Sequence, residues 1–345
     1  MKRVLSLLLL MGLLCTLCAC DAEPDKDNGT AGSQVEVPGT GNNEKPNATE
    51  PTQTEPQITY PKPSQELSGE LGGMNYHLSL DGTLTITGEG YWSDCVEYDD
   101  LATNAPWYPE REAILKIVIS EGIENVPTHA FYGCTNVLCI ELPETMTKIG
   151  NLSFSYCANL KSIEFPDAIT NIGRRSFAGA LSLADIKWPE SLTFIGQDAF
   201  SGCAIETLVL PESVKEIQMG AFASCKLLRE VTIPSKVKEI GKGTFKFCDS
   251  LTTVHIGDGV ETIGENAFYS CDALEVMIIP ENVKYIGSSA FEKCVNLKRV
   301  EIYAWNMIFE TDIFKGCENV CVYGPPKSTT ESFCNYNGIP FEVLS

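Results

Sequence analysis

The sequence predicts a mainly β solenoid, in which one short structural unit is repeated and stacked along the chain. Nine phenylalanines recur every 23 residues, with a single interval of 22: Phe131, Phe154, Phe177, Phe200, Phe222, Phe245, Phe268, Phe291 and Phe314. Around each of them the skeleton L-x-x-I-x-I, V-x-x-I-G and A-F-x-x-C returns with small variations, as in residues 251–273. A fixed period of about 20–50 residues indicates a repeat architecture. We therefore expect nine stacked rungs over residues 114–319.

Each part of the repeated unit predicts one element of a rung. The L-x-x-I-x-I segment predicts a short parallel strand whose alternate residues point inward, such as Ile163 and Phe165. Proline follows this strand in six rungs, where a residue without an N–H ends the ladder. The V-x-x-I-G segment predicts a second short extended piece, and A-F-x-x-C predicts a compact turn of 3₁₀ type. The apolar residues of the skeleton are thus assigned to the core.

The first 20 residues, MKRVLSLLLLMGLLCTLCAC, predict a secretory signal segment. Two basic residues precede an apolar run over residues 4–17, which is shorter than the roughly 20 residues of a transmembrane helix. An uncleaved membrane anchor is the alternative. The ending LCAC over residues 17–20 resembles a bacterial lipobox, which implies that cleavage leaves Cys20 as the lipid-modified first residue. Such an anchor would tether the protein to a membrane rather than release it.

Residues 21–66 predict a disordered tether. The segment is rich in Pro, Thr, Glu, Asn and Gly and holds few apolar side chains, so it cannot bury enough surface to offset the entropy of ordering. Its expected role is that of a spacer that holds the repeats away from the membrane.

Residues 67–113 predict an N-terminal β cap. Two alternating runs, 76–80 and 83–87, flank Asp81-Gly82, which is a strong β-hairpin signal. The large aromatic residues that follow are expected to cover the open end of the solenoid.

Two other interpretations of the cap compete with simple packing. Trp92 and Trp107 would serve as a sugar-binding platform if their rings were exposed. The acidic group of Asp94, Glu97, Asp99 and Asp100 suggests a calcium loop. Its spacing departs from that of an EF-hand and it has no glycine at the turn, so a solvated acidic loop is preferred.

The cysteines follow the repeat. Eight of the 15 cysteines lie three residues after a repeat phenylalanine, and the third rung has Ala180 there. A position that accepts Cys or Ala favours a small buried group, so we expect reduced, structural thiols. Some adventitious bridging between rungs is the alternative. No C-x-x-C pair occurs in the repeats, which disfavours a zinc site.

The repeated unit resembles the BspA-type leucine-rich repeat of bacterial surface proteins, which form right-handed solenoids. It lacks the asparagine that follows the strand in ordinary leucine-rich repeats and carries proline there. The resemblance covers residues 114–319 and extends to the sequence APWY at 105–108 and to a C-terminal cap over 320–345. It implies a cell-surface protein of adhesion or host interaction, whose partner is an extracellular protein or glycan.

The sequence argues against an enzyme and against nucleic-acid binding. There are three histidines, and no nucleophile–histidine grouping, phosphate-binding loop or paired carboxylates emerge, so no cofactor or metal is expected. The formal net charge of -21 is the opposite of the basic surface that nucleic acids require.

If a binding surface exists, the outward residues of the repeat strands are its expected location, because solenoids bind through extended faces. Val209, Thr232, His255, Ile278 and Val276 form a mostly uncharged patch across four rungs. Exposed apolar patches often mark protein contacts, although strands favour β-branched residues on propensity alone. The sequence thus predicts a lipid-anchored protein on the outer face of a bacterial membrane that binds a partner through its repeats. A structural spacer without a specific ligand is the alternative.

Overall fold

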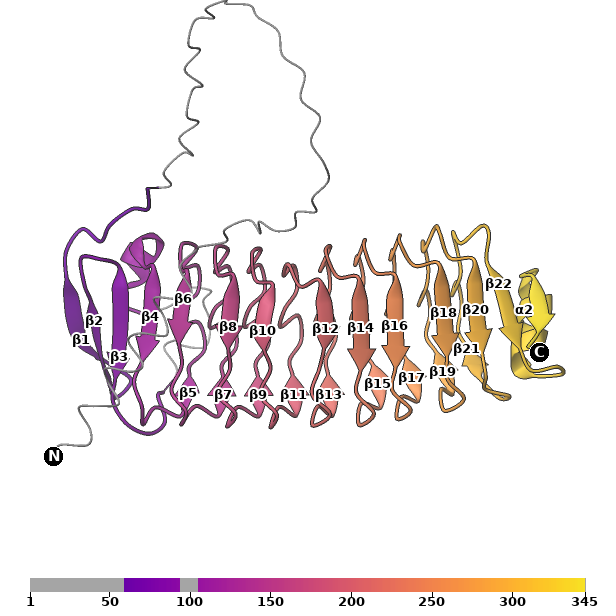
Figure 1. The fold of residues 1–345 in the computed structure, drawn as a ribbon, viewed down its shortest axis with the longest axis horizontal. Helices are drawn as coiled ribbons and strands as arrows, with labels where there is room; N and C mark the ends of the chain where they lie inside the picture. The colour runs from indigo at the N-terminus through magenta and orange to yellow at the C-terminus, as the bar shows by residue number, and fades with distance from the viewer. Residues whose placement is uncertain (1–58, 94–104, 345) are drawn as a thin grey trace, which may run out of the picture. The chain divides into compact units, whose positions relative to one another are not determined.

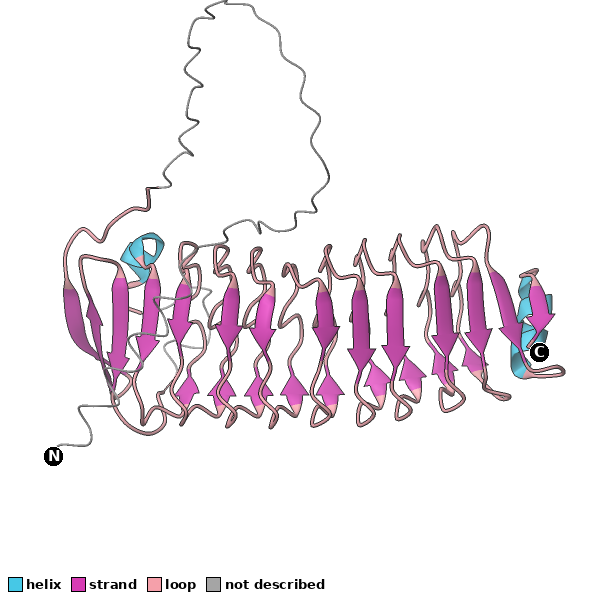
Figure 2. Ribbon diagram, viewed as in Figure 1, coloured by secondary structure: helices cyan, strands magenta, loops and turns pink. Residues whose placement is uncertain are grey.

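The computed structural model describes residues 59–93 and 105–344 of the 345-residue chain. The described residues all belong to one compact unit, which begins at Ile58. The predictions for the signal segment, for Cys20 and for the tether up to residue 58 lie outside the described residues. Within the unit, the strands follow one another in chain order along one axis (Figures 1 and 2). This arrangement confirms the predicted mainly β solenoid.

One longer strand per rung forms the first face of the solenoid, which we call the strand face. Neighbouring longer strands lie parallel and one repeat apart, so that Thr232 of one strand pairs with Val209 and His255 of the strands beside it. These strands are β4 (Lys116–Ile119), β6 (Cys139–Glu141), β8 (Ser162–Glu164), β10 (Asp185–Lys187), β12 (Thr207–Val209), β14 (Glu230–Ile233), β16 (Thr253–Ile256), β18 (Val276–Ile279) and β20 (Arg299–Ile302).

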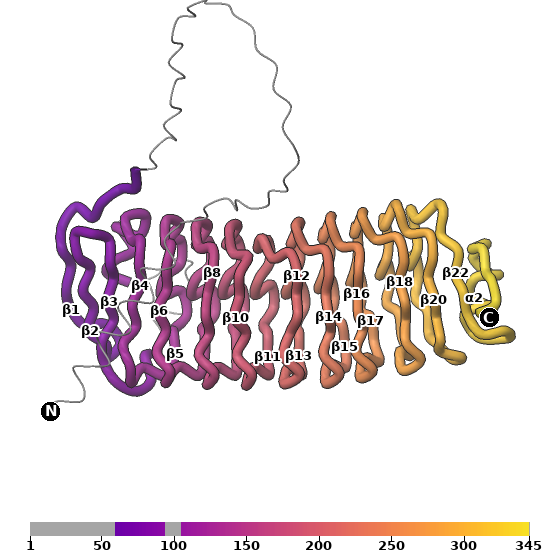
Figure 3. Tube along the Cα trace, viewed as in Figure 1, coloured from indigo at the N-terminus to yellow at the C-terminus, as the bar shows by residue number. Residues whose placement is uncertain are grey.

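A second, two-residue strand in each rung forms another parallel ladder. These strands are β5 (Asn125–Val126), β7 (Lys148–Ile149), β9 (Asn171–Ile172), β11 (Phe194–Ile195), β13 (Glu216–Ile217), β15 (Glu239–Ile240), β17 (Thr262–Ile263), β19 (Tyr285–Ile286) and β21 (Ile308–Phe309). The glycine that follows most of them is required by close approach. A Cβ on Gly173 would lie 2.7 Å from the carbonyl carbon of Gly150 in the preceding rung. Successive coils of the chain therefore lie directly against each other (Figure 3).

The A-F-x-x-C segment forms the third side of each rung, which we call the turn face. The turn closes with i→i−3 hydrogen bonds of the predicted type, as from Cys134 N to Phe131 O (3.3 Å). It does not continue into a helix, because the residues two before and two after each repeat phenylalanine have positive φ. This alternation turns the phenylalanine N–H outward along the solenoid axis. In the first eight rungs it donates to the next rung, as from Phe268 N to Ala290 O (2.8 Å).

The repeat phenylalanines form one stacked column in the core. Adjacent ring centroids lie between 5.2 and 5.9 Å apart and the rings tilt by no more than 17°. All but Phe314 are fully buried. Burial of a phenylalanine side chain contributes about 1.5–3 kcal/mol, so the column is a major source of stability.

The N-terminal cap is a three-stranded meander of β1 (Leu67–Leu71), β2 (Met74–Leu78) and β3 (Thr83–Thr87). The predicted hairpin of β2 and β3 is confirmed, and β3 joins the first rung by pairing in parallel with β4. The hairpin of β1 and β2 was not predicted, although its Gly72-Gly73 turn is a recognised signal. A 3₁₀ helix, η2 (Tyr108–Ala113), follows. Ser64, at the end of the predicted tether, donates its backbone N–H to Glu110 of η2 (3.2 Å).

Both cap tryptophans are buried, so the alternative of an exposed sugar-binding platform is wrong. Trp92 is 0% exposed and Trp107 is 1% exposed. Trp107 stacks on Phe131 at 5.9 Å, and its indole N–H donates to Ala130 O (2.9 Å). In later rungs the equivalent carbonyl accepts from the phenylalanine N–H of the preceding rung. The first rung has no preceding rung, and the Trp107 indole N–H takes that place. The acidic group at 94–100 lies outside the described residues.

The C-terminal cap continues the strand face and adds one helix. Strand β22 (Cys321–Gly324) pairs with β20, and β23 (Phe341–Val343) pairs in parallel with β22. Between them lies α2 (Thr329–Asn337), which begins with the Ser328 side chain accepting a hydrogen bond from Glu331 N (3.2 Å) and ends at Gly338 with φ 68°. Among the described residues, no helix is both long and apolar enough to cross a membrane.

The eight ladder cysteines are buried and are free thiols. Seven of the ladder thiols donate to the carbonyl of the phenylalanine in the preceding rung, for example from Cys271 Sγ to Phe245 O (3.2 Å). The sequence pattern predicts a small apolar group at this position and does not indicate this hydrogen bond. Burial raises the pKa of the Cys225 thiol to about 12 and those of Cys248 and Cys271 well above the ordinary value of 9.

Truncation of a central column residue should destabilise the solenoid strongly. Phe268→Ala leaves a cavity between two stacked rings, and we expect it to lower the free energy of unfolding by about 3–5 kcal/mol. Urea denaturation followed by circular dichroism measures the change. Lys236→Ala, an exposed position in the preceding rung, serves as the control and should change stability by less than about 0.5 kcal/mol. Equal effects of the two substitutions would contradict the burial of the column.

The raised thiol pKa values predict that stability falls at alkaline pH. The unfolded chain ionises these cysteines near pH 9, whereas burial in the folded chain raises the pKa of Cys134 and Cys225 to about 12 and that of Cys248 and Cys271 well above 9. The unfolded state therefore binds fewer protons in this window, and the free energy of unfolding decreases as pH rises through it. A variant with Cys248→Ala and Cys271→Ala should show a shallower decline of the thermal midpoint above about pH 9. An identical slope in both proteins would contradict the shifts.

Candidate functional site

The structure brings the five predicted patch residues together on the strand face. Val209, Thr232 and His255 are register partners on the neighbouring strands β12, β14 and β16. Val276 and Ile278 lie on β18, in the next rung. Their exposed fractions are 60% for Val209, 51% for Ile278 and 44% for Val276. These values place apolar surface in water. Strands β12, β14 and β16 form one sheet and β18 begins the next, so the patch crosses a break in the strand ladder.

The patch is not uniformly apolar. Its centre consists of Thr232, which is half-buried, and His255, which is exposed. The His255 ring Nε2 lies 3.2 Å from Glu230 Oε1 on the adjacent strand. The surface therefore has two apolar ends around a polar middle, an arrangement that can both bury area and orient a partner by hydrogen bonds.

Paired charges flank the patch on the same face. On one side, Lys187 of β10 bonds to Glu164 of β8. On the other side, the guanidinium of Arg299 lies 2.6 Å from Glu301 and 3.7 Å from the ring centre of Tyr323. The bond from Arg299 lowers the pKa of the Glu301 carboxyl. Because these charges are satisfied within the face, the mostly uncharged stretch between them, in which Glu230 pairs with His255, is set apart from its surroundings.

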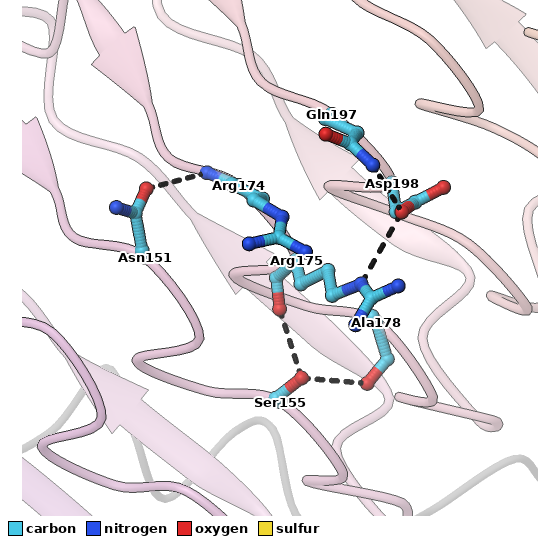
Figure 4. Close-up of polar contacts among 7 residues, drawn as sticks. All are labelled: Asn151, Ser155, Arg174, Arg175, Ala178, Gln197 and Asp198. Atoms are coloured by element: carbon cyan, nitrogen blue, oxygen red, sulfur yellow. Dashed lines mark hydrogen bonds and ion pairs between the residues drawn. The ribbon is translucent and has the colours of Figure 1, made fainter. Parts of the chain in front are cut away.

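The turn face is organised differently, by polar contacts that run from rung to rung (Figure 4). Arg175 forms an ion pair with Asp198 of the next rung, with Nε and Oδ2 3.2 Å apart. The Ser155 hydroxyl donates to Arg175 O (2.9 Å) and Ala178 O (3.3 Å). Asn151 Oδ1 accepts from Arg174 N (2.8 Å). These bonds have a structural role, because each ties one repeat to its neighbour.

The histidines and acidic residues of the described part of the chain do not gather into one cluster. No group of three or more His, Cys, Asp or Glu side chains in residues 59–93 and 105–344 could hold a metal ion. His77 bonds to Ser68 at 2.8 Å in the cap, far along the chain from His255. The two histidines thus stand apart, each beside a single polar partner.

Comparison with known proteins decides the family. Residues 108–227 and 194–321 match the family described as "BspA type Leucine rich repeat region (6 copies)". The chain belongs to the BspA-type leucine-rich repeat family. The match spans more than half of the sequence, and it confirms the resemblance seen in the repeats. No curated protein matches this chain significantly.

Two solved structures share the fold of this BspA-type protein. One is a leucine-rich repeat protein from Bacteroides ovatus, with 23% identity, a TM-score of 0.56 and coverage of 80% of this chain and 76% of the other. The second is a leucine-rich repeat protein from Eubacterium ventriosum, with 23% identity, a TM-score of 0.53 and coverage of 81% and 85%. At this identity the likeness establishes the fold alone.

Proposed function

We propose that this BspA-type protein is displayed on the bacterial cell surface by an N-terminal lipid and binds an extracellular protein or glycan through its strand face. The observation that supports the proposal is the exposed patch of Val209, Thr232, His255, Val276 and Ile278. Contiguous exposed apolar surface is costly for a monomer and commonly marks a contact site.

The chemistry of the patch favours a partner with mixed apolar and polar surface. Val209 and Ile278 would be the anchors, since burial of exposed aliphatic side chains supplies binding energy at about 25 cal/mol per Å². The pair of His255 and Glu230 offers both a donor and an acceptor between those anchors. The flanking ion pairs would form the rim, where charge tunes the rate of association more than affinity.

Charge at the two anchors should abolish recognition. A variant with Val209→Glu and Ile278→Glu is expected to weaken capture on an array of purified extracellular-matrix proteins and glycans by at least about tenfold, as loss of central contacts does. Both side chains point into solvent, so the fold should persist. The matched control is Leu181→Glu with Val295→Glu, two exposed apolar residues next to the turn face.

The control variant should bind like the native protein. Unchanged capture by the patch variant would contradict the assignment of the patch. Absence of any capture by the native protein would instead favour the alternative of a structural spacer without a specific ligand.

The anchoring part of the proposal rests on Cys20, which lies outside the described residues. Cys20→Ser removes the thiol that would carry the lipid, so we expect the protein to be released to the medium or to remain unprocessed. Metabolic labelling with a fatty acid and fractionation of the cells measure both effects. Cys18→Ser is the control and should remain lipid-modified. Normal processing and membrane retention of the Cys20→Ser protein would refute the lipobox.

A further inference from the structure

The fifth and sixth rungs, which contain Phe222 and Phe245, are held together less closely than their neighbours. Gln218 occupies the place where most other rungs have the closely packed glycine, and the preceding interval is the one shortened to 22 residues. The ladder of short strands breaks here, between β13 and β15. The ring centroids of Phe222 and Phe245 lie 5.9 Å apart, which is the widest step of the column.

Backbone geometry at Gly241 shows the same loosening. In the other rungs that carry this glycine, its N–H donates to the preceding rung, as from Gly264 N to Ile240 O (2.8 Å). Among the described residues, Gly241 N–H has no such bond to Ile217 O. A Cβ added to Gly241 would lie 3.2 Å from Ile217 O of the preceding rung. A Cβ added to Gly150 would lie only 2.5 Å from the equivalent atom, Val126 O.

A hollow of about 270 Å³ lies on the turn face beside this break. It is lined by Met219 of the fifth rung, by four residues of the sixth rung, and by Asn266 and Tyr269 of the seventh. It exists partly because the outward residue two before the phenylalanine is glycine here, Gly243, whereas it is Asn266 in the next rung. Met219 and Phe247, each 41% exposed, form apolar walls. Tyr269 packs edge-on against Phe247, with ring centroids 5.4 Å apart.

The core does not require these apolar walls. Phe247 occupies a left-handed backbone position, with φ 62°, which a bulky residue adopts at a cost. The neighbouring rungs place Ser224 and Ser270 at the same position, with φ 60° and 55°. A serine would therefore satisfy the fold there, and the exposed phenylalanine calls for a reason outside folding.

The charge around the hollow is positive, although the chain as a whole carries -21. Lys242 is compensated by Glu265 at 2.8 Å. Lys246, by contrast, forms no ion pair with any acidic group of the described residues. Lys293 donates a hydrogen bond to the Tyr269 hydroxyl, which raises the pKa of its ammonium group.

We infer that this hollow binds a carboxylated sugar ring, such as a uronic or sialic acid residue of a glycan. The aromatic walls match the flat apolar face of a pyranose. The Asn266 amide nitrogen donates one hydrogen bond to Glu265 Oε1 (3.0 Å), which leaves its second N–H and its oxygen for a sugar hydroxyl. The Tyr269 hydroxyl accepts from Lys293 and can still donate to a sugar hydroxyl. Lys246 matches the carboxylate by a charge-assisted hydrogen bond. The volume suits a single ring, since larger ligands occupy pockets of about 300–1,000 Å³. The acidic side chain of a peptide ligand would pair with Lys246 but would leave the aromatic walls uncovered.

Ligand-observed saturation-transfer NMR on the full chain tests the inference. The probes are D-glucuronate, N-acetylneuraminate, D-glucose and tetraglutamate. We expect one or both acidic sugars to bind with a dissociation constant at or below about 10 mM, and the affinity to fall with added salt because a charge pair contributes. The two acidic sugars distinguish a uronic from a sialic source. Glucose and tetraglutamate should bind at least about tenfold more weakly.

Three variants locate the site. Lys246→Gln removes the uncompensated charge, Phe247→Ser introduces the residue that neighbouring rungs carry, and Gly243→Asn fills the hollow with the residue of the next rung. Each should weaken binding of the acidic sugar by about tenfold or more. Lys215→Gln, at an exposed lysine of the fifth rung away from the hollow, is the matched control and should leave binding unchanged. Thermal midpoints near that of the native protein establish that the variants fold.

Several outcomes would overturn the inference. These are absence of binding by both acidic sugars, equal binding of glucose, binding of tetraglutamate alone, or affinities that all three site variants leave intact. The strand-face patch is not part of the hollow, so the variant with Val209→Glu and Ile278→Glu should bind the sugar normally.

Discussion

The hydrogen bond that each rung donates to the next is the constraint on which the structure depends. Positive φ on both sides of each repeat phenylalanine turns its N–H along the solenoid axis, and in the first eight rungs a carbonyl of the following rung accepts it. That bond sets the spacing at which the phenylalanine rings stack and at which the ladder thiols reach the preceding carbonyl. A glycine follows most of the short strands because the same spacing leaves no room for a Cβ. Backbone, column and cysteines are thus consequences of one repeat distance.

This constraint separates the residues that build the fold from those free to vary. The inward residues of a rung meet the same neighbours in every repeat, so they converge on Leu, Ile, Val, Phe and Cys. The outward residues meet solvent, and nothing in the packing decides whether a strand presents Lys187 or Val209. The fold therefore does not determine the residues of the strand-face patch. Surface residues of this kind are where specific recognition in a repeat protein resides.

Much of this architecture follows from the sequence, because nine copies of one pattern indicate the same strand and turn assignments where a single copy would be ambiguous. The period, the inward Ile163 and Phe165 and the outward row through Val209 all follow from alternation alone. Two cap elements had signals that were not used, namely Gly72-Gly73 for the first hairpin and the S-x-x-E sequence from Ser328 for the helix. The thiol hydrogen bonds and the bond from Trp107 to Ala130 were beyond prediction, since they depend on atomic distances between segments a full repeat apart.

The hollow on the turn face, which spans the fifth to seventh rungs, belongs to a third category. The sequence marks the irregularity twice, with the shortened interval and with Gln218 in place of glycine. It does not reveal that the fifth and sixth rungs lie a fraction of an ångström further apart than the other rungs. Every rung of a regular solenoid repeats the shape of the last, so the stacking creates broad surfaces and not a pocket of the size of one sugar ring. A small-molecule site on such a fold must arise where the repeat fails. The fifth rung is the one interior rung that lacks the packing glycine, and the sixth rung stacks directly on it. In that sixth rung Phe247 and an uncompensated Lys246 meet solvent, which a purely structural defect would not require.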